Sequence, residues 1–245
     1  MIWAETPSPA LVFGPHEVGL VPVGATEQHG PHLPAGTDTI VATAVCTEVA
    51  AATGAVVLPA IPVGCSFGHG REIPGTLSLT PALLAALVGQ YADWAASSGL
   101  RRLLFVNGHM GNSAALGAGT DHLRLERPDL KANWVEWWLL TDRLRAAMLH
   151  EGADVHGNRA ETAMMLHVAP ELVDLAAAAG ADDEDRTGDL VFRYTASALS
   201  RNGVTGRPSE ATAALGAELM AEAVTALSAL VERGRTEEPP LSRPV

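Results

Sequence analysis

Apolar and polar residues are arranged along the chain in two kinds of segment, short continuous apolar runs and longer segments with helix-like spacing. The short runs predict buried strands, because strands that are covered on both faces are apolar throughout. These runs lie at residues 18–23, 55–63, 103–106 and 132–140. The helix-like segments lie at residues 38–53, 80–98, 141–150 and 208–232. A further helix-like segment begins at about residue 113, and another ends at residue 167.

This alternation of strands and helices predicts a three-layer α/β/α fold with a mostly parallel sheet. No internal repeat or linker-like gap interrupts the sequence, so we expect a single domain over residues 1–245. Thr80 and Pro81 mark one helix start, since threonine caps helices and proline favours the first helical position. We expect the acidic segment 176–188 to be a mobile surface loop and the tail after about residue 235 to fray.

Two of the apolar runs carry residues that complicate a regular strand. Pro59 and Pro62 interrupt the second run, and proline cannot donate a hydrogen bond to a sheet, so we expect an irregular end there. Trp134, Trp137 and Trp138 in the fourth run fit either the core or the lining of a pocket, and the core is favoured.

Side chains that can bind metal follow the first apolar run directly. Glu27 and His29 are two residues apart, so in an extended segment they point the same way. Asp38 begins a predicted helix, where the helix dipole stabilises an anion by about 0.3–1 kcal/mol. Carboxylate and imidazole ligands suit zinc, iron(II) or manganese, and the two oxygens of one aspartate can bridge two ions. The segment therefore favours a metal site, with two ions as the leading interpretation.

Each of these residues also has an ordinary structural interpretation. Glu27 could be a surface carboxylate, His29 a loop histidine with satisfied hydrogen bonds, and Asp38 a simple helix cap. For any one residue alone the structural interpretation is favoured. The three residues together in one turn-rich segment give metal binding equal weight.

Further polar groups follow other predicted elements. His109 follows the third predicted strand in a glycine-rich turn, and groups at strand ends of an α/β sheet converge on one crevice. We expect Asn107 and Asn112 to tie this turn together through side-chain to backbone hydrogen bonds. His156 and Glu161 lie at another turn that enters a helix.

The segment 64–75 is rich in glycine and proline and predicts a loop, the kind of segment that often carries function. Ser66, His69 and Glu72 are candidates for substrate contact from this loop, although structural roles are favoured for them. His32 lies inside the turn after the first strand and is a candidate for supporting a metal ligand.

Composition narrows the class of protein and its partners. Apolar residues make up 47% of the chain and charged residues 18%, which indicates a globular protein. The net charge of −12, without a basic stripe, argues against nucleic acid and anionic membranes as partners. Cys46 and Cys65 are too few for a disulfide framework. No signal peptide and no run near the ~18 apolar residues of a membrane span is seen, so we expect a cytoplasmic protein.

The polar motifs, taken together and in order, resemble the signature of the creatininase (creatinine amidohydrolase) family. The matching segments are residues 23–34 with Thr37 and Asp38, residues 107–112, His156 to Thr162, and residues 203–206 before the last predicted helix. The similarity extends over nearly the whole chain.

The resemblance implies a dinuclear hydrolase that cleaves C–N amide bonds, uses zinc, manganese or iron, and is built as a hexamer of α/β subunits. By motif position it implies that Glu27 and His109 hold one metal, that His29 holds the other, and that Asp38 bridges them. It also implies that His156 acts as a proton shuttle near the substrate.

Three features depart from the family pattern. Gly111 stands where creatininase itself has a glutamate that completes the second metal, and Glu161 is the expected substitute. Met110 replaces the usual glycine after the strand-end histidine and is expected to project near the pocket. Residues 156–158 are His-Gly-Asn, where His-Ala-Gly is more usual. These changes are compatible with the metal centre and put creatinine itself in doubt as the substrate.

Three functions are consistent with the sequence. The leading one is an amidohydrolase acting on a cyclic amide or related small substrate, in which His156, or Glu161 if it is not a ligand, moves the proton. The second is a peptidase that trims a modified precursor peptide, as in the mycofactocin branch of the family, which the chain resembles in residues 67–76 and its C-terminal portion. The third is a metal-binding scaffold without catalysis. A homo-oligomer is expected in each case by family resemblance.

Overall fold

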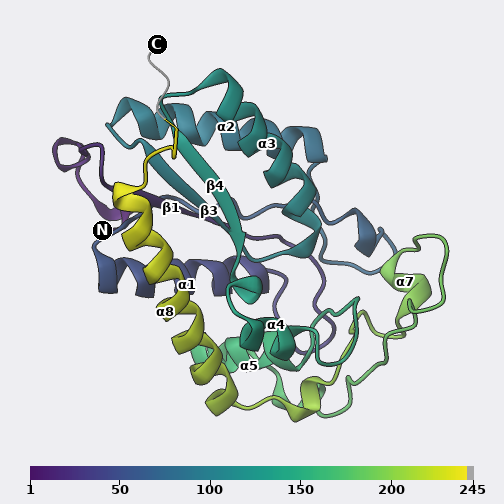
Figure 1. The fold of residues 1–245 in the computed structure, drawn as a ribbon. Coiled ribbons are helices and arrows are strands. Elements are labelled where there is room, and N and C mark those ends of the chain that lie inside the picture. Colours follow the sequence, from purple (N-terminus) through teal and green to yellow (C-terminus); the bar gives the residue numbers. More distant parts are fainter. Residues whose placement is uncertain (242–245) are drawn as a thin grey trace.

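A parallel four-stranded sheet forms the centre of the molecule in the computed structural model, which describes residues 1–241 (Figure 1). In spatial order the strands are β2 (Val56–Val57), β1 (Val18–Val23), β3 (Arg102–Asn107) and β4 (Lys131–Glu136). Val23 pairs with Asn107 and Asn107 pairs with Glu136, so β1, β3 and β4 end level with one another. Segments that follow these strands therefore emerge at one edge of the sheet.

Helices cover both faces of this sheet (Figure 1). On one face lie α1 (Thr37–Thr53), α5 (Arg159–Val168) and α8 (Ala213–Thr236), and on the other lie α2 (Pro81–Ser97) and α3 (Ser113–Glu126). Shorter helices in the later connections are α4 (Asp142–Met148), α6 (Leu175–Ala178) and α7 (Ala196–Leu199). The predicted three-layer α/β/α fold with a parallel sheet is confirmed.

The two helical layers explain why the central strands are apolar throughout. Side chains alternate along a strand, so Val18 and Leu20 enter the core beneath α1, α5 and α8, whereas Val21 and Val23 enter the core beneath α2 and α3. All six residues of β1 are buried. Burial on both faces produces the unbroken apolar run seen in the sequence.

The second apolar run forms less strand than its length suggested. Only the two residues of β2 pair with β1, and Ile61 adds an isolated bridge to Val23. Pro59 and Pro62 flank that bridge, so the irregular end expected from the two prolines is confirmed.

The predicted strand at 132–140 was too long, since β4 ends at Glu136 and Trp137–Leu139 form a 3-10 turn. The rings of Trp137 and Trp138 meet edge to face, and both residues are 2% exposed within the core. The core interpretation of these two tryptophans is therefore confirmed.

The last helix begins and ends later than predicted. Thr212 caps α8 by accepting a hydrogen bond from the Leu215 N–H, so the regular helix starts at 213 rather than 208. Beyond the helix, Glu238 pairs with both Arg102 and Lys131. The expected fraying after residue 235 stays a prediction, and for 242–245 it lies outside the described residues.

Within the described residues, α8 is long and apolar enough to cross a membrane by length and composition alone. Its buried residues, which include Leu219, Ala223 and Leu227, pack in the core with α1 and α5. A core helix passes the same test, so the finding gives little support to a membrane span.

The acidic segment 176–188 is tied to the rest of the molecule by hydrogen bonds at Asp182, Asp183 and Asp185. Asp183 is 8% exposed and accepts hydrogen bonds from Arg186, Ser200 and the Arg201 N–H. Its acidic neighbours Asp182 and Glu184 are both exposed, whereas Asp183 is buried. The segment is thus an anchored connection.

Candidate metal centre

The six residues predicted for the site meet beyond the carboxyl edge of the sheet, although four segments of the chain supply them. Glu27 and His29 follow β1, Asp38 lies in the first turn of α1, His109 follows β3, and His156 and Glu161 lie around the start of α5. Three sets of side chains each offer ligand atoms within 4.8 Å of one another. The sets are Glu27–Asp38–His109, His29–Asp38–Glu161 and Glu27–His29–His156.

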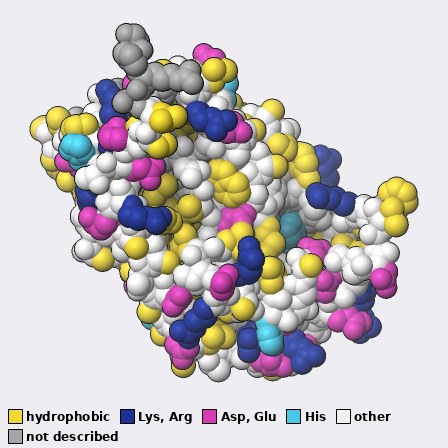
Figure 2. All heavy atoms as spheres, viewed as in Figure 1, with side chains coloured by type: hydrophobic (Ala, Val, Ile, Leu, Met, Phe, Trp, Pro, Cys, Tyr) yellow, Lys and Arg dark blue, Asp and Glu magenta, His cyan; other side chains and the backbone are white. Residues whose placement is uncertain are grey.

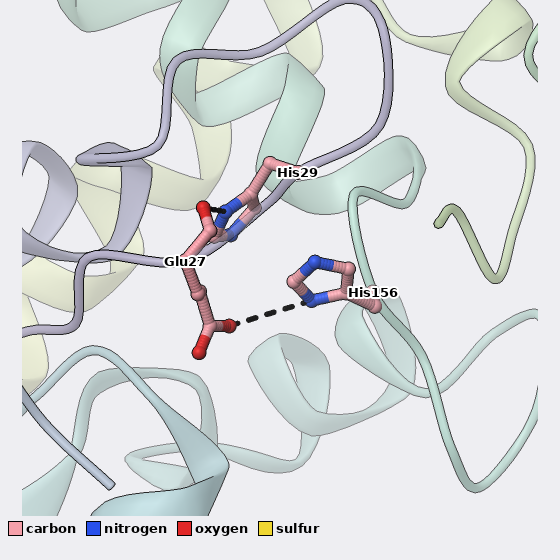
Figure 3. A group of neighbouring side chains, drawn as sticks. All are labelled: Glu27, His29 and His156. Carbon is pink, nitrogen blue, oxygen red and sulfur yellow. Dashed lines mark hydrogen bonds and ion pairs between the residues drawn. The ribbon is translucent and has the colours of Figure 1, made fainter. Parts of the chain in front are cut away.

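Glu27 places a buried carboxylate among three histidines. Its Oε1 lies 3.1 Å from Nε2 of His69, 3.2 Å from Nδ1 of His109 and 3.6 Å from Nδ1 of His156. Figure 3 shows the Glu27 side chain directed toward His156, while the Glu27 backbone carbonyl meets the ring of His29. The two rings of His29 and His156 pack with centroids 4.3 Å apart.

Asp38 divides its two oxygens between two histidines, one of which, His109, also contacts Glu27. Its Oδ1 lies 3.2 Å from Nε2 of His29, and its Oδ2 lies 3.5 Å from Nδ1 of His109. Asp38 is 3% exposed and belongs to two of the three candidate ligand sets. Asp38 therefore offers a ligand atom to each of two candidate groups.

Hydrogen bonds on the outer side of three histidines determine which ring nitrogen faces the site. His29 donates its Nδ1–H to the Glu27 carbonyl at 3.1 Å, and His109 donates its Nε2–H to the Cys65 carbonyl at 3.1 Å. His156 donates its Nε2–H to the Gln28 carbonyl. Because a carbonyl only accepts, each outer nitrogen carries a proton and each inner nitrogen is the one directed at the carboxylates. Metal-ligating histidines adopt this arrangement.

Glu161 is positioned by the start of its own helix. Asn158 accepts a hydrogen bond from the Glu161 N–H at 3.0 Å, and Oε2 of Glu161 accepts one from the Asn158 N–H at 3.3 Å. This capping box fixes Glu161 beside His29 and Asp38. Asn158, one of the departures from the family pattern, therefore has a structural function in the site.

Charge within the cluster follows from burial and from these contacts. Burial alone would raise the pKa of Glu27, but His109, His69 and His156 hold that pKa well below its usual range. Burial alone would lower the pKa of His29 and of His109, but the neighbouring carboxylates raise these values to about 10 and about 9. Burial raises the pKa of Glu161 to about 7. Without a cation, the two histidines thus retain protons between the carboxylates.

The carboxylates lack the hydrogen-bond partners that buried oxygens normally have. Among the described residues, no donor is aligned to hydrogen-bond either carboxylate oxygen of Glu27 or Oδ2 of Asp38, although histidine nitrogens lie close. A buried charge without such partners is unfavourable unless a counter-ion satisfies it. The oxygens and the inner histidine nitrogens together fit divalent metal ions.

The turn after β3 is tied together as predicted. Asn107 donates to the His109 carbonyl at 2.8 Å and accepts from the His109 N–H at 3.1 Å. Asn112 donates to the Gly24 carbonyl at 2.9 Å and accepts from the Cys65 N–H at 2.8 Å. The two asparagines therefore join the segments after β1 and β3 and hold His109 at the site.

Gly111 fills a position at which a side chain would not fit. A Cβ there would lie 2.2 Å from the Cys65 carbonyl oxygen and 2.4 Å from Nε2 of His109. The hydrogen bond that orients His109 thus occupies the space in which a larger residue would begin. Met110, expected near the pocket, is partly buried and packs against the core on the α1 face.

The glycine-rich loop reaches the site through His69, which sequence analysis named only as a candidate for substrate contact. Its neighbour Ser66 is buried and its hydroxyl has no partner among the described residues, whereas Glu72 is exposed and accepts from Ser197. Sequence analysis missed Gln28, whose side chain contacts His69. The only available signal for Gln28 was its place between Glu27 and His29.

His32 lies behind the candidate ligands rather than among them. Its Nε2 lies 2.8 Å from the hydroxyl of Thr162, the residue after Glu161. Burial, with the nearby His29, lowers the pKa of His32 to about 4, so the ring is neutral. Its contact with the start of α5 is consistent with the supporting role considered from the sequence.

The molecular surface is hollowed beside the projecting segment around α7, and a histidine side chain lies in the hollow (Figure 2). The segment around α7 approaches the 3-10 turn Phe67–His69, which carries one of the histidines that contact Glu27. The His69 side chain on that turn is 12% exposed, so the cluster has some access to solvent there.

The fold and the carboxylate–histidine cluster together are typical of a metal-dependent α/β hydrolase, and comparison with known proteins identifies the family. The family model described as "Creatininase: Creatinine amidohydrolase" matches residues 9–231. This chain belongs to the creatininase family, as the resemblance of its motifs predicted.

Several relatives are named as hydrolases of C–N bonds. The mycofactocin precursor peptide peptidase of Mycolicibacterium smegmatis is 38% identical over 87% of this chain and 84% of its own length. The creatinine amidohydrolase of Pseudomonas putida is 37% identical over 64% of this chain and 66% of its own length. The predicted assignment to an amidohydrolase family is confirmed.

Solved structures agree with this assignment. A crystal structure of creatinine amidohydrolase superposes with a TM-score of 0.85 at 30% identity, covering 97% of this chain and 98% of the other. Two further similar structures are named "Creatininase Mn" and a mutant creatininase of "Zn-Zn type". Two of the three predicted metals, zinc and manganese, thus match those named for structural neighbours, and this chain has candidate ligand groups for divalent metals.

Proposed function

We propose that the protein is a dinuclear metal-dependent hydrolase that cleaves a C–N amide bond. The observation that carries the proposal is the division of the Asp38 carboxylate, with one oxygen at His29 and the other at His109. Glu27 and His109 would hold the first ion, His29 and Glu161 the second, and Asp38 both. This assignment follows two of the three candidate ligand sets.

The cations would activate water and polarise the amide carbonyl, since a bound divalent ion lowers the pKa of water from 15.7 to about 7. The protein's own contribution is to hold the ligands in place before any ion binds. The backbone carbonyls of Glu27 and Cys65 orient His29 and His109, and the capping box at Asn158 orients Glu161. These contacts support tight binding in a fixed geometry.

His156 is the proposed proton carrier. Its Nε2–H is held by the Gln28 carbonyl, which leaves Nδ1 as the nitrogen that can accept a proton on the site side. Burial, together with the nearby His29 and His69, lowers the pKa of His156 well below its usual value, so the ring is neutral and able to act as a base. Transfer of that proton to the leaving nitrogen would contribute about 10²–10⁴-fold in rate.

A peptide substrate is the second candidate, and two observations favour it over creatinine. The curated relatives with the widest coverage here are peptidases of a precursor peptide. The connections at the approach to the site also expose large apolar side chains, Phe67, Val191, Phe192 and Tyr194. An extended substrate with apolar side chains could contact these residues, whereas a small ring would not reach them.

Metal analysis coupled to a substrate panel tests the proposal. Protein loaded with zinc or manganese should bind two ions per chain and hydrolyse one of creatinine, formamides or short peptides. Asp38→Asn should lose metal and activity together, and the matched control Glu48→Gln, an exposed carboxylate on the same helix, should retain both. Full activity and metal content in Asp38→Asn would refute the shared role, and metal binding without turnover on any substrate would favour the scaffold hypothesis.

We also propose that the protein is cytoplasmic and forms a homo-oligomer, which by family resemblance is a hexamer. Light scattering of the purified protein at micromolar concentration should give six times the 25.5 kDa chain mass. A monomer mass under those conditions would separate this chain from the hexameric members of the family.

A further inference from the structure

A fourth histidine, His69, approaches Glu27 as closely as His109 does, yet its hydrogen bonds differ from those of the other three. Its Nε2 lies 3.1 Å from Oε1 of Glu27. Its other ring nitrogen, Nδ1, meets no carbonyl but lies 3.0 Å from the side-chain Nε2 of Gln28. The orientation of the Gln28 amide therefore decides which nitrogen of His69 bears the proton.

The backbone fixes the orientation of that amide. Oε1 of Gln28 accepts a hydrogen bond from the Gly30 N–H at 3.0 Å, and Nε2 of Gln28 donates to the Gly203 carbonyl at 2.9 Å. A backbone N–H can only donate and a carbonyl can only accept, so exchanging the amide O and N would place donor against donor and acceptor against acceptor. The group that faces His69 is therefore the NH₂ end.

An NH₂ group has only protons to offer, so Nδ1 of His69 must be the bare, accepting nitrogen. The ring proton then resides on Nε2, 3.1 Å from Oε1 of Glu27, where the negative charge of the carboxylate attracts it without an aligned hydrogen bond and would repel a lone pair. We propose that Gln28 holds His69 in the Nε2–H form, so that His69 is a positioning residue that steadies the Glu27 carboxylate and is not a metal ligand.

The turn that carries Gly203 is shaped around this amide. A Cβ at Gly203 would lie 1.9 Å from Oε1 of Gln28, and its backbone φ of +86° also favours glycine. The contact joins positions 175 residues apart in sequence. A chain of contacts thus runs from Gly203 through Gln28 and His69 to Glu27. His69 directs an N–H at the carboxylate, whereas the other three histidines direct their inner nitrogens at the carboxylates.

The protonated nitrogen of His69 can be observed directly. Long-range ¹H–¹⁵N correlation spectra of histidine-labelled, zinc-loaded protein, with His69 assigned by its loss in His69→Gln, should show a proton on Nε2 and none on Nδ1. Gln28→Glu, which offers only acceptors, should move a proton onto Nδ1, whereas the control Gln28→Met should remove the preference. A proton on Nδ1 in the wild type, or a zinc-shifted Nε2, would overturn the proposal.

Metal binding distinguishes a positioning residue from a ligand. Glutamine can place an N–H near the Nε2 position and leucine cannot, so His69→Gln should keep zinc affinity within a few-fold while His69→Leu should lose about 10- to 100-fold. Both should still bind the wild-type number of ions. Equal loss in both variants, or one ion fewer in each, would identify His69 as a ligand and refute the proposal.

The positioning role rests on the proposed metal function of Glu27, but the tautomer does not. If the protein binds no metal, the same spectra of the metal-free chain still test whether Gln28 sets the proton on His69. A wild-type Nε2–H form with no metal binding would therefore contradict the proposed function and leave the Gln28–His69 contact established.

Discussion

At the scale of single residues, the site is determined by which atoms can donate and which can only accept. Three backbone carbonyls each take one N–H from His29, His109 and His156, and this leaves the remaining ring nitrogens directed at Glu27 and Asp38. Sequence could place these residues at strand ends. It could not give the partner carbonyl of Cys65, which lies 44 residues before His109.

Gly111 is constrained by the hydrogen bond between His109 and the Cys65 carbonyl, and this gives a testable substitution. Gly111→Ala should lower the free energy of unfolding by about 1–3 kcal/mol, because its Cβ would collide with the Cys65 carbonyl that orients His109. Metal affinity should fall with it. Gly89→Ala in α2 has open space around its Cβ and should be neutral or stabilising, by up to about 1 kcal/mol. Urea unfolding and zinc titration measure both effects, and a neutral Gly111→Ala would show that the space is not limiting.

Protonation of the histidines predicts how the metal-free protein responds to pH. The pKa values of His29 and His109 are raised to about 10 and about 9 in the folded state, above the unfolded value of 6.5. The folded state therefore binds more protons, and this stability is present below about pH 6.5 and is lost as the pH rises through 9 to 10. Denaturant unfolding at pH 7 and pH 10 should show the loss, and His29→Asn should show less of it. A flat profile for the wild type would argue against carboxylates paired with these rings.

At the scale of elements, regular structure was predictable wherever local pattern and burial agree. The run at 18–23 became β1 unchanged, since both of its faces are covered, and Thr80 with Pro81 marked the start of α2. The runs at 55–63 and 132–140 were longer than the strands they form, because prolines and a 3-10 turn end the pairing. Hydrophobicity alone does not distinguish a residue that pairs with a neighbouring strand from a residue that is buried without such pairing.

The start of α5 links helix capping to the site. Asn158→Ala should cost about 0.5–2 kcal/mol by removing the N-cap and should also lower metal affinity, because Glu161 loses its backbone anchor. Thr212→Ala, which removes the cap of α8 away from the site, should cost a similar amount without changing metal affinity. Thermal unfolding and isothermal titration with zinc make the comparison. Equal metal affinity in both variants would show that the capping box does not position Glu161.

At the scale of the whole molecule, the ends of β1 and β3 and the starts of α1 and α5 bring together residues more than a hundred positions apart. Family resemblance and strand-end placement were enough to predict Glu27, His29, Asp38, His109, His156 and Glu161 as one cluster. They were not enough to find Gln28, because its role depends on the Gly203 turn and the loop at 66–72 meeting in space. Contacts between distant connections leave no periodic signal in the sequence.

Because the ligands come from four segments, metal should stabilise the whole fold. Zinc present at 100 times its dissociation constant should add about 2.7 kcal/mol to the free energy of unfolding. For a chain of this size that corresponds to a rise in Tm of about 5–10 °C. Differential scanning calorimetry with and without zinc measures the shift, and Asp38→Asn should abolish it. An unchanged Tm in the wild type at saturating zinc would contradict binding to the folded cluster.

Anomalous scattering from crystals of the zinc-loaded protein tests the shared carboxylate most directly. Two peaks about 3.5–4 Å apart should flank Asp38, the distance typical of paired catalytic metals. One should lie against Glu27 and His109, and the other against His29 and Glu161. A single peak, or two peaks that do not share Asp38, would contradict the account.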